Sequence, residues 1–272
     1  MLFLYLGIIR GMDEKKTVYY QDEYNDDFAG NNISTKSISN DYKYINESWL
    51  FKANAFWLKY LFAVPLLWIA NTIIFRPKVK NKEVLKGLKK KGYYLYSNHV
   101  LPFDPVVLPI KTNVRKNTVI IAGHDLFSIN PIVSWIVKHF YAIPVPNKDK
   151  EMNDHYLECL SWNINKGSRV LIYPEAHIWP YYNDIRPLKP GAFRYPVNDN
   201  APVVVATTTF KKRKGNRKPK PIIYLDGPYY PDDSLPYRDS VNELANRVYE
   251  CMKYRASSVD NYSYIDYVKK SE

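Results

Sequence analysis

The sequence has 272 residues and carries 39 Lys and Arg against 27 Asp and Glu, a net charge of +12. Hydrophobic residues make up 46% and charged residues 24%, a balance typical of a globular chain that excludes a largely disordered protein. Two cysteines are too few for a disulfide-stabilised fold and fit a reducing compartment. The chain contains neither a P-loop pattern nor the spacings of common zinc sites. A basic chain rich in Tyr and Trp fits nucleic acid or an anionic membrane surface.

The N-terminal region, residues 1–46, shows no sustained hydrophobic period. Residues 1–9 are apolar but too few to span a bilayer, and a basic residue follows this run instead of preceding it, which argues against a signal peptide. The sequence leaves open whether Met1 or Met12 is the natural start. Residues 13–41 are polar and acidic. We therefore expect residues 1–46 to form a flexible arm with little regular structure.

The most apolar stretch, residues 55–75, lies within a segment, 47–79, that we expect to associate with a membrane. As a helix it would reach roughly 31 Å, about the thickness of a hydrocarbon core. Lys59 and Pro65 interrupt the stretch and favour a bent helix in the plane of one leaflet over a spanning helix. A helix buried in the protein core is the alternative.

Aromatic and basic side chains accompany this stretch. Trp57 and Trp68 are spaced like interfacial anchors, and the run that follows includes Lys78 and Lys80. Basic residues beside an apolar helix mark the cytoplasmic side and attract anionic lipid headgroups. These four side chains are therefore expected to contact the membrane at its cytoplasmic face.

From residue 93 onward the pattern alternates between short apolar runs and helix-like segments. The expected strands are residues 93–97, 118–122, 141–145, 169–173, 202–209 and 221–225, and the expected helices are 105–110, 131–140, 150–165 and 240–255. This alternation predicts one α/β domain over residues 80–255, with a central mostly parallel or mixed sheet flanked by helices. Residues 256–272 are expected to form a C-terminal tail.

The segment from Asn98 to Pro105 follows the first of these strands and carries candidate chemistry. Pro105 suits the first position of a helix, which makes Asp104 the expected N-cap and leaves residues 98–103 as a turn. Such a turn folds the imidazole of His99 back toward the Asp104 carboxylate. The carboxylate then fixes the tautomer of the ring and leaves its other nitrogen free to accept a proton. A capping aspartate beside an unrelated histidine is the alternative.

A second group of polar residues follows the strand expected at 169–173. Glu175 and His177 come just beyond its carboxyl end, which is where α/β folds bind ligands. Lys189 and Gly191 then precede the strand expected at 202–209.

In this order the segments resemble the glycerolipid acyltransferase family, which includes the 1-acylglycerol-3-phosphate acyltransferases. The first family motif, Asn-His-x-x-x-x-Asp, is matched by Asn98, His99 and Asp104. The third, Phe-Pro-Glu-Gly-Thr-Arg, is matched in its first half, and the later Lys-x-Gly is present. The second block is matched by residues 122–127, Pro131 and residues 143–145. The resemblance spans about residues 93–210 and includes an apolar segment ahead of it.

Two departures from the family concern the acceptor. The third motif continues Ala176-His177-Ile178 instead of Gly-Thr-Arg, and the second block ends at Lys148 where the family usually has an arginine. In the family those arginines are associated with the acceptor's phosphate, which bidentate Arg suits well. His177, Arg186, Lys189 and Lys148 are candidate replacements. The alternative is an acceptor without a phosphate at that position.

The resemblance implies a membrane-associated O-acyltransferase that moves a fatty acyl group from acyl-CoA or acyl carrier protein to a lysoglycerolipid hydroxyl. His99 and Asp104 are the expected general-base dyad, and the expected substrate-binding residues are Asn98, Glu175, His177, Arg186, Lys189 and Gly191. The thioester is a co-substrate, so no cofactor or metal is expected. The implied partners are anionic membrane lipids and the acyl donor, without nucleic acid; the oligomeric state stays open.

Two alternatives remain. Residues 211–220 hold seven basic residues, which also fits a nucleic-acid-binding protein, although no recognition module is evident. An inactive lipid-binding member of the family is the other. Cys159 and Cys251 are expected to be small core residues on helices, and His139 to serve packing or the surface.

Overall fold

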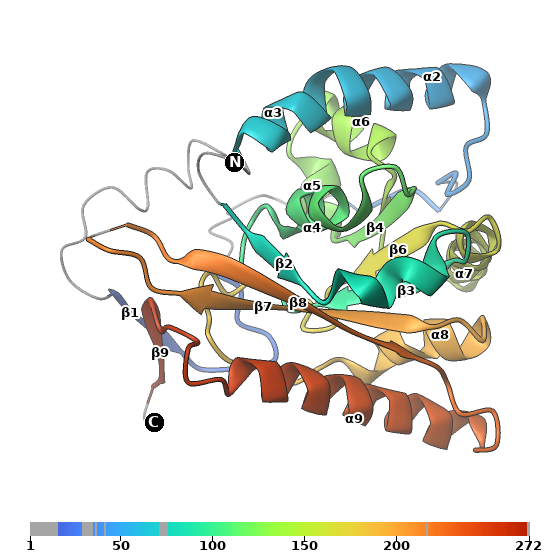
Figure 1. The fold of residues 1–272 in the computed structure, drawn as a ribbon. Coiled ribbons are helices and arrows are strands. Elements are labelled where there is room, and N and C mark those ends of the chain that lie inside the picture. Colours follow the sequence, from blue (N-terminus) through green and yellow to red (C-terminus); the bar gives the residue numbers. More distant parts are fainter. Residues whose placement is uncertain are drawn as a thin grey trace.

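The computed structural model describes residues 16–28, 35, 37–40, 42–70, 76–215 and 217–270. Its centre is a seven-stranded sheet in the order β2-β8-β7-β3-β6-β4-β5 (Figure 1). The strands are β2 (Lys78–Lys80), β3 (Tyr93–Ser97), β4 (Thr118–Ala122), β5 (Ala142–Pro144), β6 (Arg169–Ile172), β7 (Val203–Lys211) and β8 (Lys220–Tyr229). The mixed α/β architecture that we expected is therefore present.

Five neighbouring strands of this sheet, β7, β3, β6, β4 and β5, run parallel. β8 returns antiparallel to β7, and β2 pairs parallel with β8. The carboxyl ends of the five parallel strands therefore meet along one edge of the sheet, the edge at which open α/β sheets bind ligands.

The central strand β3 is buried on both faces, which is typical of a parallel sheet covered by helices on both sides. Its side chains alternate between two apolar clusters, with Tyr93 and Leu95 in one and Tyr94 and Tyr96 in the other. The buried hydroxyls find acceptors, since Tyr96 donates to the carbonyl of Ala192 at 2.6 Å. A buried and fully bonded β3 is a rigid support for the residues that follow it.

Helices cover both faces of the sheet (Figure 1). α7 (Lys150–Asn165), α8 (Arg194–Asn198) with the 3₁₀ turn η4 (Pro190–Phe193), and α9 (Tyr237–Ala256) contribute to the cluster around Tyr94 and Tyr96. The 3₁₀ helix η3 (Lys82–Leu88) and α4 (Asp104–Asn113) contribute to the opposite cluster. The short helices α5 (His124–Ser128) and α6 (Pro131–His139) link β4 to β5.

Helix α4 is tied to the sheet by the buried side chain of Arg169, at the start of β6. The guanidinium donates to the carbonyl of Pro109 at 3.2 Å and to that of Asn113 at 3.1 Å, which are carbonyls near the end of the helix. It also bonds the hydroxyls of Thr112 and Thr118. A cation at a helix C-terminus is favourable because it meets the negative end of the helix dipole.

The N-terminal arm, which we expected to have little regular structure, contains a strand that pairs with one in the C-terminal tail. Residues 16–20 form β1 (Lys16–Tyr20), which pairs parallel with β9 (Ile265–Lys269) in a separate two-stranded sheet. Tyr44 is buried in the main apolar cluster. These residues order because their aromatic side chains pack on the domain, which a polar composition does not reveal. Residues 1–15, 29–34, 36 and 41 lie outside the described residues.

The helix of the apolar segment begins at Trp49, within the expected bounds of 47–79 and ahead of the most apolar stretch. α2 (Trp49–Trp57), a π-helical turn η1 (Leu58–Ala63) and α3 (Val64–Ala70) follow one another without a break. Pro65 has no N–H to donate, and its ring crowds the carbonyl four residues before it, where the turn is widened. The expected part of this segment at residues 71–75 lies outside the described residues. Among the described residues, no helix combines the length and the apolarity that crossing a membrane requires.

Replacing Arg169 with lysine is expected to destabilise the fold by about 2–4 kcal/mol. Lysine cannot reach all of these acceptors at once, and each buried carbonyl left unpaired costs about 1–3 kcal/mol. Thermal unfolding should show a fall in Tm of roughly 5–15 °C for a chain of this size. Arg194→Lys, on the exposed start of α8, is the matched control and should leave Tm unchanged. An Arg169→Lys variant as stable as this control would contradict the role given to the guanidinium.

Candidate active site

His99 and Asp104 meet at the carboxyl edge of the sheet. His99 lies two residues beyond β3, and its Nδ1 is 3.8 Å from Oδ2 of Asp104. Asp104 is the first residue of α4, with Phe103 in the cap position, so it is not the N-cap that we expected. Its Oδ2 instead accepts the backbone N–H groups of Val100 at 3.1 Å and Leu101 at 2.8 Å. These bonds fold the turn back and bring the imidazole to the carboxylate.

The carboxyl group of Asp104 is completely buried. Burial raises its pKa, while the facing His99 ring and the two backbone N–H groups oppose that rise. The imidazole of His99 is partly exposed and presents Nδ1 to the carboxylate. Asp104 is therefore placed to fix the orientation of a histidine that solvent and substrate can reach.

Asn98, an expected substrate-binding residue, follows β3 directly and bonds the neighbouring strand β7. Its Nδ2 donates to the carbonyl of Thr208 in β7 at 3.0 Å, and its Oδ1 accepts the N–H of Thr208 at 2.8 Å. The side chain is buried and both of its polar ends are occupied by the backbone of β7. Asn98 therefore positions the turn that carries His99.

Glu175, expected to orient the acceptor, lies just beyond β6 and is also buried. Its Oε2 accepts the backbone N–H of His99 at 3.0 Å, and its Oε1 accepts that of Arg186 at 3.0 Å. Burial raises the pKa of Glu175, and the Arg186 guanidinium is the largest influence that opposes the rise. The hydrogen bonds of Glu175 thus hold the His99 backbone and the loop after β6.

Two aromatic residues contact His99 and were not among the expected site residues. The ring of Tyr173 stacks on the imidazole with centroids 4.1 Å apart and planes 21° apart. The backbone N–H of Trp179 donates to the carbonyl of His99 at 3.1 Å. The aromatic position that opens the third motif was the available signal for Tyr173, whereas nothing in the spacing of Trp179 indicated its contact.

The other expected acceptor residues lie around the loop after β6. Arg186 is buried, donates to Oε2 of Glu175 and to the carbonyl of His177, and stacks over the ring of Trp179 at 4.9 Å. His177 is partly exposed, and its Nδ1 lies 3.7 Å from Oδ2 of Asp27. Lys189 is half-buried and reaches Asn25. The structure therefore places His177 and Lys189, from the loop after β6, in contact with the N-terminal arm.

Two motif positions where the family has glycine differ in whether the structure requires a glycine there. Ala176 occupies the position of the family's motif glycine and has a φ of +67°, in the left-handed region that favours glycine. The backbone turn of the motif thus survives a residue that adopts it at a cost. A Cβ at Gly191 would meet no atom within 4 Å, so packing does not require glycine there.

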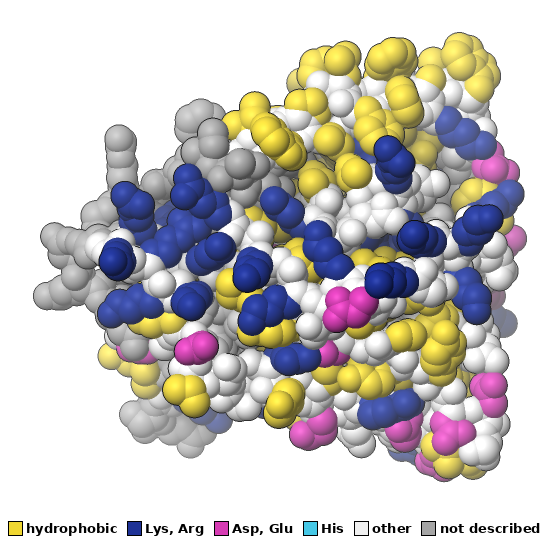
Figure 2. All heavy atoms as spheres, viewed as in Figure 1, with side chains coloured by type: hydrophobic (Ala, Val, Ile, Leu, Met, Phe, Trp, Pro, Cys, Tyr) yellow, Lys and Arg dark blue, Asp and Glu magenta, His cyan; other side chains and the backbone are white. Residues whose placement is uncertain are grey.

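The four expected membrane-contact residues lie on the surface of the molecule. Trp57 and Trp68 are 58% and 61% exposed on the helix that runs from α2 to α3. Lys78 and Lys80 are exposed on β2, at the edge of the sheet. Apolar side chains cover the α2–α3 side of the molecule, and Lys and Arg side chains are spread across the face beside it (Figure 2).

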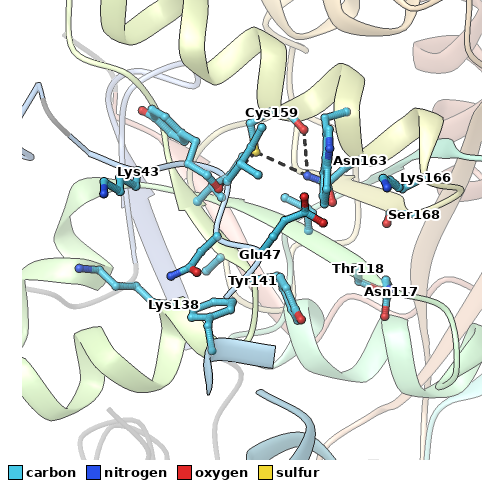
Figure 3. Close-up of a pocket in the computed structure, with 18 of the residues that line it drawn as sticks. Lys43, Glu47, Asn117, Thr118, Lys138, Tyr141, Cys159, Asn163, Lys166 and Ser168 are labelled. Atoms are coloured by element: carbon cyan, nitrogen blue, oxygen red, sulfur yellow. Dashed lines mark hydrogen bonds between the residues drawn. The ribbon is translucent and has the colours of Figure 1, made fainter. Parts of the chain in front are cut away.

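A cavity of about 680 Å³ lies at the opposite edge of the sheet from His99. Residues at the start of β4 and just before β6 line it, together with Tyr141, and Lys43 and Lys138 lie across it from Lys166 (Figure 3). Cys159 also lines it, and burial raises the pKa of this thiol to about 11. The thiol therefore stays protonated at neutral pH and is a poor nucleophile.

The remaining titratable candidates also have structural surroundings. His139 is buried and stacks with Phe51, as expected of a packing residue. Burial raises the pKa of the Cys251 thiol to about 11. Among the described residues, no group of three His, Cys, Asp or Glu side chains has the arrangement of a metal site.

Comparison with known proteins agrees with this geometry. Residues 76–208 match the model of the family described as Acyltransferase. The fold is similar to the crystal structure of PlsC, the 1-acyl-sn-glycerophosphate (LPA) acyltransferase of Thermotoga maritima, with a TM-score of 0.54 and 13% sequence identity. The similarity covers 79% of this chain and 86% of that one. No curated protein matches the chain in a sequence comparison.

The matched region holds β2 to β6, the first part of β7, and the residues seen to contact His99: Asp104, Tyr173, Glu175 and Trp179. It defines an acyltransferase domain. The chain thus holds a region that matches the acyltransferase family, in a fold similar to that of the Thermotoga maritima protein.

Replacing Asp104 with asparagine is expected to separate activity from stability. The asparagine Oδ1 can still accept the two backbone N–H groups, but the charge that faces His99 is lost. Acyltransferase activity should fall by at least about 10²-fold, the lower range for general-base catalysis. The buried carboxyl has a raised pKa, so its ionised form opposes folding as the pH rises through that pKa.

The stability of the variant relative to that of wild type should therefore increase as the pH is raised from about 4 to about 7. Thermal unfolding at both pH values, beside the exposed control Asp154→Asn, measures the difference. A variant that unfolds far below wild type at both pH values would contradict this account of the buried carboxyl.

Proposed function

We propose that this protein transfers a fatty acyl group from acyl-CoA or acyl carrier protein to a lysoglycerolipid hydroxyl at the cytoplasmic face of a membrane. The observation that carries the proposal is the pairing of His99 with the buried Asp104 at the carboxyl end of the central strand of an acyltransferase domain. The family match supports the class of reaction, and the contacts of the two side chains support their roles.

In the proposed reaction, Nε2 of His99 accepts the proton of the acceptor hydroxyl as its oxygen attacks the thioester carbonyl. Asp104 faces Nδ1, which keeps the proton on that nitrogen and stabilises the imidazolium that forms. The tetrahedral intermediate then expels the thiolate, which accepts the proton that Nε2 took from the acceptor hydroxyl. An ester and a free thiol result. The distance of 3.8 Å from Nδ1 to Oδ2 is longer than a hydrogen bond, and the proposed reaction requires it to shorten when substrate binds.

Direct transfer requires no acyl-enzyme, and the surroundings of the thiols support that. Cys159 and Cys251 both have raised pKa values, so neither supplies a thiolate at neutral pH. The stacked ring of Tyr173 restricts rotation of the imidazole, and the bonds from Asn98 and Glu175 hold its backbone. The base is thus held in place before substrate binds.

His99→Ala is expected to lower acyl transfer by at least about 10²-fold, because the proton acceptor is lost. Thiol released from acyl-CoA or acyl carrier protein in the presence of a lysoglycerolipid measures the rate. His139→Ala, a change of the same kind away from the edge that carries His99, is the control for loss of a histidine. Wild-type turnover by His99→Ala would rule out the mechanism.

Membrane association, the second part of the proposal, draws support from an exposed apolar surface. The helix from Trp49 to Ala70 presents large side chains to solvent, and α6 adds Ile132 and Trp135 beside it: the exposed residues on the helix include Leu50, Phe56, Trp57, Leu61, Phe62, Leu66, Trp68 and Ile69. A contiguous patch of this kind is unusual on a soluble monomer and marks an interaction surface. Its interrupted helix fits one lying in the plane of a leaflet.

Basic residues adjoin this surface and suit the headgroup region. Lys78 and Lys80 lie on the sheet edge, and the hairpin between β7 and β8 adds Lys212, Arg213 and Lys214. Figure 2 shows such side chains across the face next to the apolar one. Anionic headgroups attract a basic surface by about 1 kcal/mol for each nearby Lys or Arg.

The double variant Phe62→Glu/Leu66→Glu is expected to lower partitioning onto anionic vesicles by at least about 10²-fold, since each replaced side chain contributes roughly 1.5–3 kcal/mol when buried. Flotation with vesicles of phosphatidylcholine and phosphatidylserine measures it. Tyr254→Glu/Val259→Glu replaces exposed residues at the end of α9, on the opposite side of the molecule from α2, and should float like wild type (Figure 1).

High salt should weaken vesicle binding of the wild type, because the basic residues contribute by screened attraction. A Phe62→Glu/Leu66→Glu variant that floats like wild type would contradict the proposed surface. Tight, salt-sensitive binding to nucleic acid without flotation would favour the nucleic-acid alternative instead.

A further inference from the structure

The described part of the N-terminal arm, residues 16–28, packs over the third motif of the acyltransferase domain. The indole N–H of Trp179 donates to the carbonyl of Asp26 at 2.7 Å, and the N–H of Phe28 donates to the carbonyl of Ile178 at 3.2 Å. The rings of Tyr20 and Phe28 lie 4.7 and 5.2 Å from the ring of Trp179. Hydrogen bonds and aromatic contacts thus fix the arm beside the loop that holds His99.

The arm is acidic where it meets this loop. Asp22, Glu23, Asp26 and Asp27 lie within six residues of one another. Asp27 faces the imidazole of His177, and Asp26 accepts the backbone N–H groups of Gln21 and Asp22, which orders the turn. The negative charge therefore lies in a defined place.

Three of the four candidates for an acceptor phosphate, His177, Arg186 and Lys189, are engaged, whereas Lys148 is exposed. The ammonium of Lys189 donates to Oδ1 of Asn25 at 3.5 Å and lies 5.2 Å from the centre of the Tyr24 ring. Lys189 also helps to lower the pKa of Asp22. Arg186 is 1% exposed, between Glu175 and the Trp179 ring. A phosphate would have to displace these partners.

Ile178 lies at the motif position where the family has arginine. Its side chain is buried, and its carbonyl accepts the N–H of Phe28 from the arm. An aliphatic side chain there supplies no donor to an anion. Carboxylates accept hydrogen bonds but donate none, so the acidic arm matches hydroxyl donors and repels phosphate.

We propose that the acidic arm forms one wall of the acceptor site and selects a phosphate-free lysoglycerolipid, a neutral lipid whose free hydroxyls face Asp27. This inference rests on the proposed function and names its acceptor class. Asp27 is the residue that sets the preference, since it faces His177 at the third motif.

The test compares 1-oleoylglycerol with 1-oleoylglycerol 3-phosphate as acceptors for oleoyl-CoA, in mixed micelles, with the product separated by chromatography. Wild type should show a kcat/KM for the neutral acceptor at least about tenfold above that for the phosphate. Asp27→Lys reverses the charge and should shift the ratio of the two values toward the phosphate by about tenfold, and Asp27→Asn by less. Asp154→Lys, which makes the same charge change on the exposed face of α7, should leave the ratio unchanged.

The shift should shrink at about 0.5 M salt, because Asp27 is partly exposed and its field is screened. A preference of wild type for the phosphate acceptor, with transfer that depends on His99, would overturn this inference and leave the proposed function standing. Equal ratios in the Asp27 variants and in Asp154→Lys would also overturn it. Thiol release that survives His99→Ala would instead overturn the proposed function.

Discussion

The architecture of the site depends on how the chain is held as it leaves the central strand. Asn98 bonds the backbone of β7 on one side, and Glu175, just beyond β6, bonds the backbone N–H of His99 on the other. Both side chains are buried, where a hydrogen bond is costly to lose. The position of His99 is therefore set by three adjacent strands, whose bonds hold the backbone that carries the imidazole.

A second support comes from the helix that carries Asp104. In the first turn of α4, the Asp104 carboxylate accepts the backbone N–H groups of Val100 and Leu101. The last turn is bonded to the sheet by Arg169. Both ends of α4 are thus fixed by a charged side chain of the sign that its dipole favours. The cost of burying each charge is offset by bonds that also keep the carboxylate in register with His99.

The sequence predicted the parts of the fold that depend on local pattern. The apolar runs that became β3 and β6 are nearly unbroken, and the motif from Asn98 to Asp104 predicted the approach of imidazole and carboxylate. The bonds of Asn98 to β7 and of Glu175 to the His99 backbone were not predicted, because the direction of a side chain at a strand end depends on which strands lie beside it. The pairing of β1 with β9 joins distant segments, and no local pattern predicts such a partner.

That pairing has a consequence for the order in which the protein matures. Lys16 pairs with Ile265, so the arm can complete its small sheet only after Ile265 has left the ribosome. The edge of the large sheet that carries His99 needs only β3, β6, β7 and α4, which are all made earlier. During synthesis the residues around His99 are therefore assembled before the arm packs beside them.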